Sequence, residues 1–116
     1  MPSLRHQRVR ELLKRAIAEI LRREINSEEC GLMSINEVGV GNDLKSAIVF
    51  VGIVGSDAQR KRGAAKLKKE RGHFQNLLAR EVVLRYTPKL KFRIDDSIEQ
   101  GNRVLQIIEE LEDKRE

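Results

Sequence analysis

Apolar residues recur at steps of three and four from Arg5 to Ile25, with cations between them. This spacing lines the apolar side chains along one stripe of a helix and leaves the cations off that stripe. The pattern predicts a long amphipathic helix that packs on a core, and we interpret residues 28–31 after it as a loop. The stripe consists of Val9, Leu12, Leu13, Ala16, Ile17, Ile20 and Leu21.

Two segments rich in β-branched residues follow, 32–40 and 46–54, with a polar turn between them that contains glycine and asparagine. This arrangement predicts a β-hairpin. The apolar alternation of the first segment changes phase, and a β-bulge near Asn36 and Glu37 would absorb that change. The second segment is almost continuously apolar, so we expect it to be a central strand.

The segment after Gly55 carries many cations and few apolar residues. Its start, Ser56-Asp57-Ala58-Gln59, has the pattern of a capping box, which predicts a helix from this point. Because glycine costs about 1 kcal/mol inside a helix relative to alanine, Glu70-Arg71-Gly72 predicts a break at the glycine. An amphipathic pattern resumes at His73 and predicts a second helix, which Pro88 cannot continue.

Residues 89–94 alternate between apolar and basic, as expected for a strand with one buried face. Asp96-Ser97-Ile98-Glu99 is a second capping-box pattern. It predicts a final helix whose acidic end, at about residues 109–116, frays. The expected architecture is an α+β fold in which amphipathic helices cover a three-stranded sheet.

The length of 116 residues suits a single domain over residues 1–116. The sequence has no apolar run long enough to cross a membrane, and its N-terminus lacks the apolar centre of a signal peptide, so we expect a cytoplasmic protein. Cys30 is the only cysteine, which excludes an internal disulfide. One cysteine and the well-separated His6 and His73 make a zinc site improbable.

Charge is distributed unevenly along the chain. Residues 57–93 carry twelve basic and three acidic side chains, whereas residues 94–116 carry three basic and eight acidic ones. Such asymmetry indicates a surface for a polyanion. The alternative is a solvated helix surface, which is the usual explanation of a charge run, but the size of this swing favours the polyanion.

Enzymatic chemistry has little support in the sequence. The serines have no neighbouring histidine, Asp95-Asp96 is explained by helix capping, and neither a phosphate-binding loop nor metal-ligand spacing occurs. We therefore expect no enzymatic activity, no cofactor and no metal site. Gly52-Ile53-Val54-Gly55 matches the G-x-x-G loop of KH domains. That loop must join two helices, so we interpret this one as the end of a strand.

The candidate RNA-binding residues are the cations around the predicted helix break and on the last strand, together with the glycine of the break. Their charges would contact phosphates, and the four aromatic residues are too few for base-by-base reading. Tyr86 is interpreted as a structural turn residue. The candidates are Arg60, Lys61, Lys66, Lys68, Lys69, Arg71, Gly72, Lys89, Lys91 and Arg93.

The order of elements and several residues resemble the bacterial ribosome-binding factor A family over nearly the whole length. The most specific match is Pro88-x-Leu90-x-Phe92-x-x-Asp95-x-Ser97, followed by Gly101. The other matching residues are Arg8-Val9, Val38, Val40, Asp43-Leu44, Ala47, Val49, Val51, Gly72 and Leu84-Arg85.

This resemblance implies a KH-like fold of type II order, helix-strand-strand-helix-helix-strand, to which the predicted C-terminal helix is an addition. It implies an assembly factor that binds the small ribosomal subunit and its rRNA during late maturation and processing, supports growth in the cold, and is released with the help of a ribosome-associated GTPase. The family has an Ala-x-Gly kink in place of the KH clamp. The triplet here is Glu70-Arg71-Gly72, so the glycine matches and the alanine does not.

Three functional hypotheses therefore follow. The first is rRNA binding in ribosome assembly by a monomer that uses the candidate cations. The second is a protein-interaction module, whose first helix or acidic tail docks on a ribosomal protein without direct RNA contact. An unrecognised hydrolase, the weakest possibility, would need polar groups that converge in a pocket.

Overall fold

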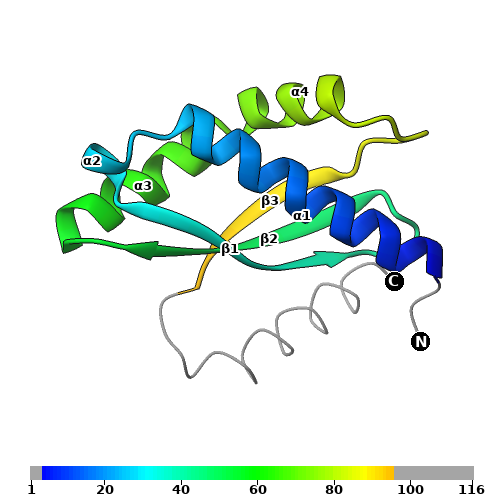
Figure 1. The fold of residues 1–116 in the computed structure, drawn as a ribbon, viewed down its shortest axis with the longest axis horizontal. Helices are drawn as coiled ribbons and strands as arrows, with labels where there is room; N and C mark the ends of the chain where they lie inside the picture. The colour runs from blue at the N-terminus through cyan, green and yellow to red at the C-terminus, as the bar shows by residue number, and fades with distance from the viewer. Residues whose placement is uncertain (1–3, 96–116) are drawn as a thin grey trace.

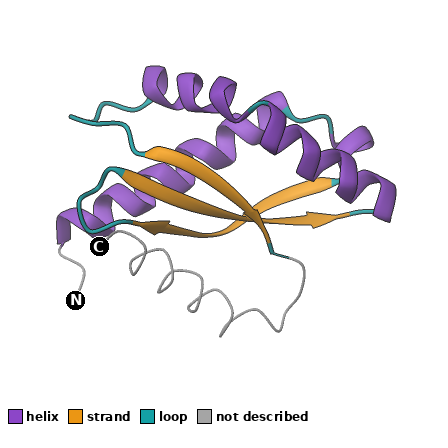
Figure 2. Cartoon of the chain, turned by 180° about the vertical axis from the view of Figure 1, so that it is seen from behind, coloured by secondary structure: helices purple, strands orange, loops and turns teal. Residues whose placement is uncertain are grey.

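A computed structural model describes residues 4–95 of the chain. Its three strands form one sheet in the order β1-β2-β3, in which β1 and β2 are antiparallel and β2 and β3 are parallel. The labelled helices cover one face of this sheet (Figure 1), and the view from behind shows them on the same side (Figure 2). The elements are α1 (Leu4–Glu24), α2 (Ser27–Cys30), β1 (Leu32–Val40), β2 (Ser46–Val54), α3 (Asp57–Lys69), α4 (Arg71–Glu81) and β3 (Lys89–Ile94).

The hairpin of β1 and β2 confirms the predicted strand boundaries. Its register shifts between Ile35 and Glu37, which confirms the predicted bulge. β2 pairs with a strand on each side, so the continuous apolar pattern correctly identified the central strand.

The apolar stripe of α1 packs on the sheet. Leu13 and Ile17 are almost completely buried, whereas Leu12 lies at the rim of the stripe with 39% of its surface exposed. Val49 and Val51 of the central strand belong to the same cluster of buried side chains. One long helix on one sheet face therefore forms the main two-layer core.

Helix α4 completes this core above β3. Phe74 and Leu78 are its buried residues. The ring of Phe74 packs edge-on against Phe92 of β3, with ring centroids 5.9 Å apart. This geometry is favoured for aromatic pairs and fixes α4 against the last strand of the sheet.

The predicted loop at residues 28–31 is wrong, because the single-turn helix α2 occupies most of it. The Asn26 side chain caps this turn by accepting a hydrogen bond from the Glu28 backbone N–H at 2.8 Å. Gly31 ends the turn with φ of +76°, in the region that glycine tolerates best. These two local caps stabilise a single helical turn. The turn is too short to show apolar periodicity, so the sequence pattern did not reveal it.

The predicted capping box of α3 is confirmed by reciprocal hydrogen bonds between Ser56 and Gln59. The predicted helix break is also present, but it lies at Glu70 rather than at Gly72. Glu70 donates its N–H to the carbonyl of Lys66 and accepts from the N–H of Phe74, so it serves both helices. Gly72 belongs to the first turn of α4 and does not have a left-handed φ.

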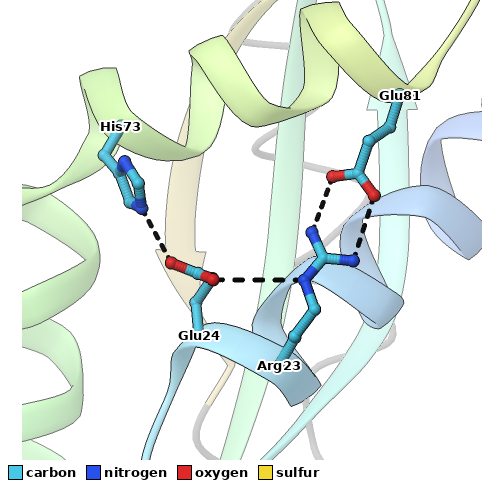
Figure 3. Close-up of polar contacts among 4 residues, drawn as sticks. All are labelled: Arg23, Glu24, His73 and Glu81. Carbon is cyan, nitrogen blue, oxygen red and sulfur yellow. Dashed lines mark hydrogen bonds and ion pairs between the residues drawn. The ribbon is translucent and has the colours of Figure 1, made fainter.

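An exposed polar cluster joins the end of α1 to α4 (Figure 3). Arg23 donates to both carboxylate oxygens of Glu81, at 3.0 and 2.7 Å. His73 Nε2 lies 2.8 Å from Glu24 Oε1. The hydrogen bond from Arg23 lowers the pKa of the Glu81 carboxyl below its ordinary value, because the guanidinium favours the charged form.

The predicted C-terminal helix, its capping box and its frayed end fall outside residues 4–95. They remain predictions, as does the assignment of the whole chain to one domain.

Candidate nucleic-acid interface

Strand β3 presents its cations on the sheet face opposite the helices. Leu90 is buried in the core beneath the helices, whereas Lys89, Lys91 and Arg93 alternate with the apolar positions and are exposed. None of the three forms an ion pair within the described part of the chain. The predicted alternation is confirmed, and it leaves three uncompensated charges in a row along one strand.

The cations of α3 lie in the helix layer. Gly63 and Leu67 form its buried side, and the opposite side exposes Lys61, Lys68 and Lys69 to solvent. These three lysines, here called the α3 cations, make no ion pair among residues 4–95.

Lys66 differs from its neighbours because it has an acidic partner. Its Nζ lies 3.2 Å from Glu70 Oε2, one helical turn away. This hydrogen bond raises the pKa of Lys66. The carboxylate partly compensates the lysine charge, so Lys66 is a weaker candidate for a phosphate contact than the α3 cations.

Arg71 lies where the helix layer meets β3. Its Nη1 donates to the Leu90 carbonyl at 3.3 Å. Gln75, one turn further along α4, donates to the Pro88 carbonyl and accepts from the Leu90 N–H, both at 2.8 Å. The start of α4 is thereby held against the start of β3.

Arg71 also shares a hollow of about 330 Å³ with two cations of β3. Lys89 and Lys91 line it from the last strand, and residues 46–48 of β2, of which Ala47 and Ile48 are apolar, form its wall. Arg71, Lys89, Lys91 and Arg93 are called the basic edge below. The structure thus brings Arg71, at the start of α4, beside the cations of β3. The α3 cations lie elsewhere in the helix layer.

The two remaining candidates have separate places. Arg60 is half-buried near the start of α3, and Gly72 is exposed in the first turn of α4. The candidate cations as a whole therefore lie in two layers, the sheet and the helices, and do not form one flat face.

Sequence reasoning missed a second group of cations at one end of the sheet. Arg5, Lys45 and Arg85 line a smaller hollow together with Tyr86, which is 62% exposed. One weak signal could have indicated this group. Lys45 lies in the turn before β2, and Arg85 and Tyr86 lie in the loop before β3. A parallel pairing of the two strands would bring both segments to the same end of the sheet.

The described residues offer little for other chemistry. No cluster of three or more potential metal ligands occurs among them, and none of their helices is long and apolar enough to span a membrane. The Gly52–Gly55 segment lies at the end of β2, with Gly52 buried, so it does not form a loop between two helices. Its interpretation as a strand end is confirmed.

This is an α+β fold with a three-stranded sheet, helices on one face of it, and the order α1-α2-β1-β2-α3-α4-β3. Such an arrangement is a KH-like fold. The family model for ribosome-binding factor A matches residues 5–108. Ribosome-binding factor A of Halothermothrix orenii is 36% identical over 116 residues, which cover 100% of this chain and 95% of that protein. The chain therefore belongs to the ribosome-binding factor A family.

Solved structures of the family support the fold. The crystal structure of ribosome-binding factor A from Thermus thermophilus superposes with a TM-score of 0.64 at 23% identity, covering 76% of this chain and 92% of that one. A homology model of the Thermus thermophilus protein, fitted into a cryo-electron-microscopy map of its 30S complex, gives 0.61 at 24% identity, covering 72% and 88%.

Proposed function

We propose that this protein binds the small ribosomal subunit as an assembly factor and contacts rRNA through the basic edge and the α3 cations. Family membership supports the ribosomal role, and the Thermus thermophilus relative was fitted into a map of its 30S complex. The observation that carries the RNA contact is the row of exposed cations on β3, two of which share a hollow with Arg71.

Phosphates are the chemical groups that this surface fits best. Lysine and arginine bind phosphate oxygens by charge-assisted hydrogen bonds, and arginine adds a planar fork of donors. Three of the four cations of the basic edge are exposed, and Arg71 retains donors beyond the single one given to Leu90. Such contacts position a protein on RNA without reading its sequence, so the shape of the rRNA would define the binding site.

A protein-interaction module is the second candidate. Arg10, Lys14, Arg15 and Glu37 line a separate hollow between α1 and β1, which could receive a ribosomal protein. This surface carries both charge signs, whereas the basic edge carries one. We therefore place RNA contact first.

Cosedimentation distinguishes these two candidates. We expect the protein to pellet both with small ribosomal subunits and with small-subunit rRNA stripped of its proteins. A protein that pellets with subunits and stays in solution with stripped rRNA would be a protein-interaction module, and the proposed RNA contact would be wrong.

The finer features of the proposal follow the family resemblance. We place the action in late maturation and rRNA processing, in the cytoplasm, by a non-enzymatic monomer whose release a ribosome-associated GTPase assists. Growth in the cold would then depend on the protein. Accumulation of unprocessed small-subunit rRNA in a depleted strain at low temperature would test this role.

A further inference from the structure

A second candidate site lies at the end of the sheet where β2 and β3 both begin. The parallel pairing of these strands places Ser46 beside Lys89. The backbone N–H of Lys89 donates to the carbonyl of Lys45 at 2.9 Å, so the β1–β2 turn and the loop before β3 are joined directly. The N-terminal part of α1 lines the same hollow with Arg5 and Val9.

Tyr86 is the chemically unusual member of this group. The residue is 62% exposed, although tyrosine normally buries much of its ring. The guanidinium carbon of Arg85 lies over the ring, 5.7 Å from the centroid. No other aromatic or cationic side chain among residues 4–95 stacks on Tyr86, so one ring face is available to a planar ligand.

The cations around Tyr86 outnumber the acidic groups of the hollow. Arg5, Lys45 and Arg85 are exposed, and none of them forms an ion pair in the described part of the chain. Asp43 also lines the hollow, and its Oδ1 accepts the backbone N–H of Lys45 at 3.0 Å, so three cations face one carboxylate there. The local charge therefore favours an anionic ligand.

The backbone of the turn is held in an uncommon conformation. Leu44 has φ of +61°, a left-handed value that costs free energy for a residue with a branched side chain. The Leu44 side chain packs on the core, and its N–H donates to the Gly41 carbonyl at 2.9 Å. This anchoring fixes the position of the adjacent Lys45 beside the hollow.

We propose that this hollow binds one nucleotide of single-stranded RNA, with the base stacked on Tyr86 and the flanking phosphates on Arg5, Lys45 and Arg85. An exposed aromatic ring among exposed cations is the combination with which proteins bind single strands without sequence preference. The volume of about 210 Å³ lies below the roughly 300–1,000 Å³ of sites for larger ligands, as expected for one base. The inference rests on the proposed RNA binding and adds a stacking contact to it.

Tyrosine fluorescence tests this site directly, because the chain has one tyrosine and no tryptophan. The full-length protein is titrated with a decamer of uridylate, with an abasic ribose-phosphate decamer, and with inorganic polyphosphate. A base stacked on the ring quenches its emission, so we expect saturable quenching by oligouridylate and little by the two ligands that lack bases. Equal quenching by all three, or binding of oligouridylate without quenching, overturns the proposal.

Affinity measurements on variants give a second test. We expect Tyr86→Leu to weaken binding of labelled oligouridylate by about 5- to 150-fold, the range typical of a lost stacking contact. Tyr86→Phe retains the ring and should bind as the wild type does. Thermal unfolding of both variants controls for folding. Equal affinity of Tyr86→Leu and Tyr86→Phe would contradict stacking.

The outcomes separate this inference from the proposed function. If the wild-type protein pellets with stripped rRNA but its tyrosine emission does not respond to oligouridylate, the stacking site is wrong and the phosphate contact stands. If the protein does not pellet with stripped rRNA, the RNA contact itself is wrong, and the stacking site falls with it.

Discussion

Gly63 and Gly72 both lie in helices, yet their surroundings differ. A Cβ atom on Gly63 would approach the Met33 methyl group to 2.8 Å and the Cys30 carbonyl oxygen to 2.9 Å. A Cβ atom on Gly72 would meet nothing within 4 Å. Packing of α3 on α2 therefore requires a glycine at position 63, whereas neither space nor a left-handed φ requires one at position 72.

Gly72→Ala should stabilise the protein by about 1 kcal/mol, because alanine has the higher helix propensity and restricts the unfolded chain. Urea unfolding followed by circular dichroism measures this change. Destabilisation would show that the turn between α3 and α4 depends on this glycine after all.

Gly63→Ala should destabilise the protein by about 1–2 kcal/mol in the same assay. The added methyl group would lie 2.9 Å from a backbone oxygen that cannot move away cheaply. Overpacking typically costs about 1–3 kcal/mol, and so close a backbone contact favours the upper part of that range, about 2–3 kcal/mol. The gain of about 1 kcal/mol in helix propensity offsets part of this cost. A Gly63→Ala protein as stable as wild type would mean that α2 shifts freely relative to α3.

The sequence could not distinguish these two glycines. Each interrupts a helical pattern at a similar local cost, and only the neighbour brought close by the fold separates them. The same limit applies to Lys66 and Lys68, which look alike in sequence although only Lys66 has a carboxylate 3.2 Å away.

At the scale of elements, the contact between α1 and α4 depends partly on the Arg23–Glu81 pair. The folded-state pKa of Glu81 is lowered, so its contribution to stability is present above its ordinary pKa of 4.5 and is lost as pH falls through the lower folded value. Both side chains are well exposed, and the effect should accordingly be small.

Glu81→Gln should therefore lose less stability than wild type as the pH is lowered from neutral to below 4.5, because the variant carboxamide does not titrate. Unfolding midpoints measured across this range test the difference. Glu11→Gln is the matched control, since Glu11 is exposed on α1 and has no ion pair among residues 4–95. The same shift in both variants would argue against a specific role of the pair.

Element positions were largely predictable because periodicity and capping are local signals. Strands β1, β2 and β3, the bulge and the start of α3 all follow from such patterns. The missed helix α2 is one turn long, too short to show a period. Contacts between elements were harder to predict from the sequence. The sequence did not reveal that β2 and β3 begin at one end of the sheet, so the group around Tyr86 was not recognised as a site.

At the scale of the molecule, the positive charge is divided between two layers. The basic edge lies along β3 and at the adjoining start of α4, and the α3 cations lie in the helix layer. Sequence position alone predicted which residues are basic and exposed. The alternation along β3 also predicted that Lys89, Lys91 and Arg93 turn away from the core. The sequence did not show that the α3 cations would lie apart from them, in the helix layer.

The salt dependence of small-subunit binding tests the central claim, that particular cations, above all those of β3, and not the total charge make the RNA contact. Cosedimentation across a salt series compares wild type with a Lys89→Ala/Lys91→Ala/Arg93→Ala variant and with an Arg8→Ala/Lys14→Ala/Arg15→Ala control. The control removes three exposed cations from α1, which packs on β1 at the opposite edge of the sheet.

We predict that the β3 variant flattens the slope of log K against log salt concentration by about 2 to 3, while the control leaves it unchanged. An unchanged slope in the β3 variant, or an equal loss in both, would contradict the account.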